Sequence, residues 1–154
     1  MCLQENISDE EWLYRSFPVP DPRVNHAIHY KMIDGILRLE RGVWNDKKCQ
    51  PSVDRRILLS CASDAQWDKA DAIVQIKAEE VRSISGSISL TDTASHNHNV
   101  IFDKKEDRPA HALIVSTPPF ADKPNSEKTK WNNFKTFLSL AASKHGWVIE
   151  PQVL

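Results

Sequence analysis

The sequence is poor in glycine and in cysteine, and both shortages exclude familiar kinds of site. Only four glycines occur in 154 residues, and none belongs to a G-x-S-x-G turn or to a glycine-rich loop that could hold phosphate. The three cysteines, Cys2, Cys49 and Cys61, are odd in number and lack CxxC spacing. They indicate free thiols in a reducing compartment, so we expect a cytoplasmic protein without a disulfide framework.

The sequence also lacks an excess of charge of one sign, and it lacks long apolar runs. Twenty Lys and Arg residues stand against 21 Asp and Glu, for a formal net charge of −1. No global field therefore attracts nucleic acid or an anionic membrane. No window reaches the roughly 18 apolar residues that would cross a bilayer. A chain of 154 residues that is 40% hydrophobic predicts a single domain over residues 1–154.

The N-terminal region combines a helix-start pattern with a run of prolines. Ser8 is followed by three acidic residues, which predicts a capped helical turn over residues 8–15. Three prolines within residues 17–22 forbid helix and favour an extended path. We therefore expect residues 1–24 to form a proline-rich arm packed on the domain.

Apolar spacing and capping residues predict the helices. The apolar residues from Asn25 to Trp44 recur at intervals of three and four, which fits an amphipathic helix. The final helix, from Asn125 or Ser126 to Gly146, has its apolar stripe facing the core. Shorter helical segments are predicted at residues 52–61, 65–69 and 78–82, with Trp67 packed inward.

The strands complete a predicted α+β fold, a small mixed or antiparallel sheet with a packed C-terminal amphipathic helix. β-branched or alternating apolar residues predict strands at 72–76 and 84–90, and a last strand at 147–150. The runs 100–102 and 110–115 predict an antiparallel hairpin around a charged loop. We expect this hairpin in the middle of the sheet, because its second strand is continuously apolar.

Five histidines are candidates for a site. His26 and His29 would share a helix face, and His96 and His98 would share one side of a strand, so each pair could supply two metal ligands. Further ligands at recognisable spacing are lacking, so we expect no metal and no cofactor, with the second pair exposed in a polar loop. We interpret His111 as a structural ring whose hydrogen bonds fix the charged loop before it, although it could also border a site.

Aromatic and basic side chains indicate interaction surfaces. Five tryptophans supply more large aromatic surface than a core of this size needs, and tryptophan is enriched at interfaces. Lysines on the last helix form the only basic surface, without interleaved aromatics for base stacking. The interaction candidates are Trp12, Tyr14, Trp44, Lys128, Lys130 and Lys135.

Five short motifs occur in a fixed order along the chain. They are Glu-x-Leu-Tyr-Arg at 11–15, Ser-Val-Asp-Arg at 52–55, Ile-x-Ala-x-x-Val-Arg at 76–82, Pro-Ala-His-Ala at 109–112 and Trp-Val-Ile-x-Pro at 147–151. Their order resembles a family of small bacterial proteins that usually carry no assigned function. A Ser-Ser-x-x-Phe motif of that family is replaced here by residues 46–50. The resemblance implies a bacterial source and a compact α+β domain.

Two classes of function follow as expectations. Size, neutral charge and the lack of a recognisable site favour a noncatalytic component of a bacterial multi-protein system, of the anti-phage defence or toxin-control kind, with a protein partner encoded nearby and no membrane contact. The alternative is an enzyme, because the order of a Leu-Tyr-Arg motif and later serine and glutamate motifs resembles the layout of ADP-ribosyltransferase-type folds. In that layout Arg15 or His111 would orient a dinucleotide, and Glu79 or Glu80 would polarise its ribose. A nucleic-acid-associated factor is the weaker alternative, since only the lysines of the last helix support it.

Overall fold

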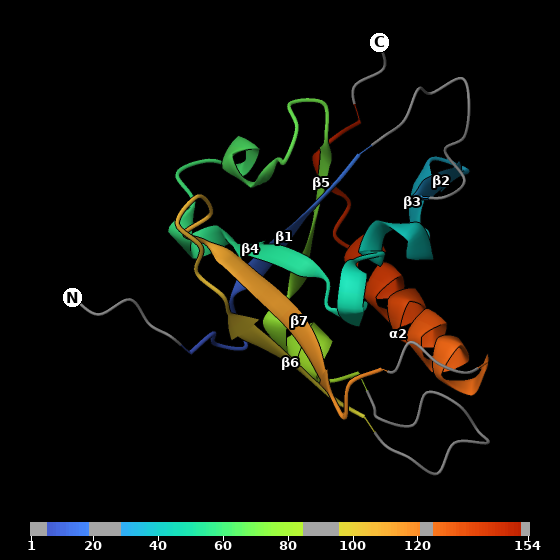
Figure 1. Cartoon of the computed structure of the whole chain (residues 1–154). Coiled ribbons are helices and arrows are strands. Elements are labelled where there is room, and N and C mark those ends of the chain that lie inside the picture. The colour runs from blue at the N-terminus through green and yellow to red at the C-terminus, as the bar shows by residue number, and fades with distance from the viewer. Residues whose placement is uncertain (1–5, 19–28, 85–95, 121–124, 152–154) are drawn as a thin grey trace.

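A computed structural model describes residues 6–18, 29–84, 96–120 and 125–151, and it shows an α+β fold (Figure 1). Six strands form one antiparallel sheet in the order β6-β7-β4-β1-β5-β8, and β2 and β3 form a separate hairpin. The strands are β1 (Trp12–Phe17), β2 (Tyr30–Ile33), β3 (Ile36–Leu39), β4 (Ser52–Arg55), β5 (Ala72–Lys77), β6 (Asn97–Phe102), β7 (His111–Thr117) and β8 (Trp147–Ile149). The α-helices are α1 (Ala78–Arg82) and α2 (Asn125–Ser143), and the 3-10 turns are η1 (Arg41–Trp44), η2 (Lys47–Cys49), η3 (Arg56–Leu58) and η4 (Ala62–Ala65).

The main core lies between α2, one face of the sheet and the β2–β3 hairpin. Phe134 and Leu138 of α2 are fully buried in a cluster with Leu13 of β1 and Val74 of β5. Removing each such side chain from water stabilises the fold by about 1.5–3 kcal/mol. The opposite face carries a smaller cluster around Tyr14, which leaves part of that face open to polar side chains. No helix within the described ranges is long and apolar enough to span a membrane.

Several predicted elements are confirmed. The strand at 72–76, the helical turn at 78–82, the pairing of residues 100–102 with 110–115, the long last helix and the final short strand are all present. The hairpin's position in the middle of the sheet is wrong, because β6 is an edge strand and β4 and β1 are central. The proline-rich arm beyond Pro18 and nearly all of the predicted strand at 84–90 lie outside the described residues.

The helix predicted over residues 25–44 is wrong in its described part. Residues 30–39 form the β2–β3 hairpin instead, and its turn is Asp34-Gly35 with φ of +52° and +78°. An Asp-Gly pair between apolar segments is a strong hairpin signal, because both turn positions need positive φ. The apolar spacing of this stretch fitted a helix only because two short strands with alternating faces were read as one segment.

The helices predicted at 8–15 and 52–61 are also wrong, and the reason lies in buried charges. The second half of 8–15, from Trp12 on, belongs to β1, and Ser52 to Arg55 form β4. The acids that suggested helix starts bind arginines across the sheet, as Glu11 binds Arg55 at 2.8 Å. Around the segment predicted at 65–69, the helical turn ends at Ala65 and Trp67 points outward, with 58% of its surface exposed.

Candidate functional site

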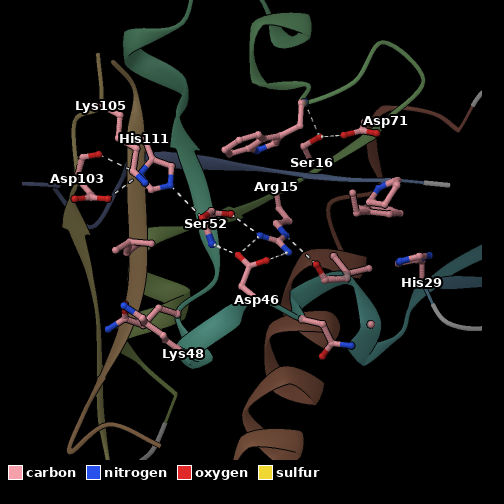
Figure 2. Close-up of a pocket in the computed structure, with 18 residues that line it drawn as sticks. Arg15, Ser16, His29, Asp46, Lys48, Ser52, Asp71, Asp103, Lys105 and His111 are labelled. Carbon is pink, nitrogen blue, oxygen red and sulfur yellow. Dashed lines mark hydrogen bonds and ion pairs between the residues drawn. The ribbon is translucent and has the colours of Figure 1, made fainter. Parts of the chain in front are cut away.

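The central strands of the sheet separate at one end, and this separation creates a cavity. β1 pairs with β5 from Trp12 to Phe17, but it pairs with β4 only at Leu13 and Tyr14. Beyond these residues the two strands are no longer joined by ladder hydrogen bonds. A cavity of about 700 Å³ opens there, a size typical of small-molecule sites. Its walls include Arg15, Ser16, Asp46, Lys48, Ser52, Trp67, Asp71, Asp103, Lys105 and His111 (Figure 2).

Arg15 fills the gap between the separated strands and holds the start of β4. Its guanidinium binds the Asp46 carboxylate through two bonds of 2.8 and 3.0 Å, and it donates to the carbonyl oxygens of Val43 and Ser52, each at 2.8 Å. Asp46 in turn accepts the Ser52 backbone N–H at 2.6 Å. Burial alone would raise the pKa of Asp46, but the bonds and charge of Arg15 hold it below its usual value. Both backbone polar groups of Ser52 are therefore fixed by one partly buried ion pair.

The side chain of Ser52 belongs to a hydrogen-bonded chain with His111 and Asp103, shown in Figure 2. The Ser52 hydroxyl lies 3.0 Å from His111 Nε2. On the other side of the ring, His111 Nδ1 lies 3.0 Å from the Asp103 carbonyl oxygen and 3.1 Å from its carboxylate. The ring is almost fully buried at the wall of the cavity.

The partners of His111 determine the direction of these hydrogen bonds. A carbonyl and a carboxylate oxygen can only accept, so Nδ1 must carry a proton. In the neutral imidazole Nε2 is then the acceptor, and the Ser52 hydroxyl donates to it. A serine hydroxyl donating to a histidine whose other nitrogen donates to an aspartate is the arrangement by which serine enzymes generate a nucleophile. The sequence led us to expect only the bond from His111 to the charged loop.

The residues predicted for an ADP-ribosyltransferase layout are only partly brought together. Arg15 and His111 line the same cavity and are linked through Ser52. Glu79 and Glu80 lie outside it, on α1. Glu80 accepts a bond of 2.7 Å from His145, and Glu79 is exposed. The described cavity therefore offers Asp103, and not a glutamate, as the acid beside His111.

The histidine pairs do not assemble a metal site in the described part of the chain, where no group of three suitable ligands occurs. His29 lines the cavity, and burial together with the charge of Arg15 lowers its pKa. His26 lies outside the described residues. The expectation that His96 and His98 are exposed is wrong, because both are buried against Phe120, and His98 also stacks on Phe134.

Burial of His98 makes stability depend on pH. Its ring is 5% exposed, and burial, with a smaller effect of His96, lowers the pKa of His98 to about 4. The unfolded ring titrates near 6.5, so below that pH the unfolded state binds the extra proton. We expect the contribution of His98 to the free energy of unfolding to be constant above pH 6.5. The free energy of unfolding should then fall by about 3 kcal/mol as the pH decreases from 6.5 to 4. Urea unfolding at several pH values measures this loss, which His98→Gln should remove; an unchanged slope in that variant would contradict the assignment.

The predicted interaction residues are mostly within the fold. Trp44 is fully buried and donates its indole N–H to Ser139 at 3.1 Å. Tyr14 is buried and Trp12 is half-buried. Lys130 and Lys135 are buried while Lys128 is exposed, and Lys135 donates to the Asn45 side chain. The described lysines of α2 therefore do not share one solvent-exposed basic face.

Ser52 and Asp103 were not recognised from the sequence as parts of a site. Ser52 resembled a helix cap, and Asp103 one acid among several in a charged loop. Ser52 and His111 are 59 positions apart, so no local spacing joins them. The one available signal was the alternation of polar and nonpolar residues in Ser52-Val53-Asp54, which fits a strand. Comparisons with protein-family models, curated proteins and solved structures gave no match to this chain.

Proposed function

We propose that the protein is a serine-dependent acyl hydrolase whose nucleophile is Ser52, whose general base is His111 and whose orienting acid is Asp103. The observation that carries this proposal is the hydrogen-bonded chain from Ser52 through His111 to Asp103, whose acceptors on Nδ1 imply that the Ser52 hydroxyl donates to His111 Nε2. This direction leaves the lone pairs of the hydroxyl oxygen available to an electrophile in the cavity that Ser52 lines.

The proposed reaction proceeds through an acyl-serine. The Ser52 oxygen attacks the carbonyl carbon of an ester or thioester while His111 Nε2 takes the hydroxyl proton. His111 returns this proton to the leaving alcohol or thiol as its bond to the acyl carbon breaks. Water then attacks the acyl-Ser52, again giving a proton to His111, and the acid is released with the hydroxyl restored. Asp103 accepts the hydrogen bond from Nδ1 and stabilises the imidazolium that forms twice in the cycle.

Arg15 and Asp46 act as positioning residues in this proposal. They hold the Ser52 carbonyl and N–H at 2.8 and 2.6 Å, so the main chain of the nucleophile cannot shift without breaking a partly buried ion pair. A productive attack geometry requires such fixation, because small displacements of reacting atoms cost large factors in rate. Lys48 and Lys105 are exposed residues of the cavity wall, and they add positive charge to a cavity in which an oxyanion would form.

The proposal is tested with a matched pair of serine variants and a small ester such as p-nitrophenyl acetate. Ser52→Ala is expected to abolish saturable hydrolysis. Ser116→Ala is the control, because Ser116 is also a strand serine bonded to a histidine, 2.8 Å from His98 Nδ1, but it does not line the cavity. Equal rates in the wild type and Ser52→Ala, with Ser116→Ala behaving alike, would exclude Ser52 as the nucleophile.

A role in a multi-protein assembly is a second proposal, and a separate observation supports it. Large apolar side chains are exposed on the β2–β3 hairpin and on α2, which contact one another. They are Met32, Ile33, Ile36, Phe137 and Leu140. Copurification from the native host tests this role: a partner released by Ile36→Asp would support it, and recovery of the free monomer alone would count against it.

A further inference from the structure

Trp67 is an exposed aromatic side chain that the surrounding residues hold in place. The Arg108 guanidinium lies over its indole ring, 3.9 Å from the centroid. Arg108 is itself fixed, because it donates to the carboxylate of Asp54 and to the carbonyl oxygen of Ala65. The Trp67 backbone N–H donates to the Ser16 hydroxyl at 3.2 Å. An aromatic ring restrained in this way loses little conformational entropy when a ligand packs on it.

Trp67 lines the same cavity as the proposed nucleophile. Trp67, Ser52 and His111 all line that cavity, whereas Arg108 is not among the described lining residues. Arg108 covers one face of the indole, and 58% of the Trp67 surface still remains exposed. Large exposed aromatic side chains in a concave site are the groups on which planar ligands stack.

We propose that Trp67 is a stacking platform that selects substrates with a planar aromatic or heteroaromatic ring for acyl transfer at Ser52. The substrate class rests on the proposed function, since the ring would be attached to the acyl group that Ser52 attacks. Ser16 supports the platform from below, because it also donates to the buried Asp71 at 2.7 Å and so keeps its oxygen directed at the Trp67 N–H. Trp67 is therefore a specificity-determining residue, and it takes no part in the proton transfers.

Binding is measured on the Ser52→Ala protein, which cannot turn over an ester. Phenylacetate and cyclohexylacetate are the probes, because they have the same charge and nearly the same size and differ in the flatness of the ring. Calorimetry is expected to show phenylacetate binding about two- to twelvefold more tightly, the range that aromatic stacking adds beyond area burial. Adding Trp67→Leu should remove the difference, Trp67→Phe should keep it, and Trp12→Leu, at a half-buried tryptophan outside the cavity, should leave it unchanged.

The two proposals fail in different ways. An unchanged preference in Trp67→Leu, or no binding of either acid, would overturn the role of Trp67. The proposed function alone would fail if phenylacetate bound more tightly than cyclohexylacetate but wild-type protein did not hydrolyse ethyl phenylacetate. Both proposals are supported if the wild-type protein hydrolyses ethyl phenylacetate faster than ethyl cyclohexylacetate and if this preference is lost in Trp67→Leu.

Discussion

Replacing His111 by glutamine is expected to lower kcat/KM for ester hydrolysis by about 10³-fold. The buried ring provides the only nitrogen bonded to the Ser52 hydroxyl among the described contacts, at 3.0 Å. Glutamine has a similar reach but cannot accept a proton near neutral pH. Steady-state kinetics with the same ester measure the loss, and a thermal scan shows whether the fold persists.

His145→Gln is the matched control for this variant. His145 also binds a carboxylate, that of Glu80 at 2.7 Å, but it lies outside the cavity. It should keep full activity. The sequence favoured a structural His111 whose loss first lowers stability, and the lost hydrogen bonds do predict a cost of about 1–3 kcal/mol. Full activity in a destabilised His111→Gln would show that the structural interpretation alone is correct.

Glu11→Gln is expected to lower the free energy of unfolding by about 3–5 kcal/mol, because it breaks a buried ion pair. Glu11 and Arg55 form two bonds of 2.8 and 2.9 Å, with 9% and 2% of their surfaces exposed. Phe102 packs on the guanidinium, 4.7 Å from its ring centroid. Glutamine keeps the shape of the side chain but removes the negative charge that Glu11 places beside the Arg55 guanidinium. Urea unfolding at neutral pH measures the change, with an unaltered m-value.

Asp9→Asn is the control for the buried pair. Asp9 binds Arg82 at 2.7 Å, but its side chain is largely exposed, so the loss should be at most about 1 kcal/mol. If both variants lost equally little, burial of the Glu11–Arg55 pair would not matter to stability. The difference between the two variants is therefore the informative quantity.

The elements that the sequence predicted well are those with one clear periodicity. The helix α2 and the strand β5 bury apolar side chains, so their periodicity can be recognised in the sequence. The central strands β1 and β4 carry Arg15, Asp54 and Arg55 in buried positions. Such charges are rare inside proteins and are tolerated here only because each meets an opposite charge from another element. That pairing is tertiary, so these strands were read as helices.

The candidate site could be predicted only in part for the same reason. Arg15 and His111 were identified as candidates, but the group that connects them was not. Ser52 is brought near His111 by the register of β4 against β7. In this register Asp54 lies opposite His111, and Ser52, two residues before Asp54, is on the same side of the strand. Asp103 is brought to the ring by the loop that ends β6. Neither arrangement leaves a local motif in the chain.

The central claim, that Ser52 is an activated nucleophile, is tested most directly by exposing the folded protein to an alkyl fluorophosphonate and locating the adduct by mass spectrometry. We predict one phosphonyl group per chain, attached to the Ser52 oxygen with loss of fluoride. It should be absent from Ser52→Ala and slowed by about 10³-fold in His111→Gln, since that variant lacks the base. An unmodified Ser52 in wild-type protein, or labelling no faster than in His111→Gln, would contradict the account.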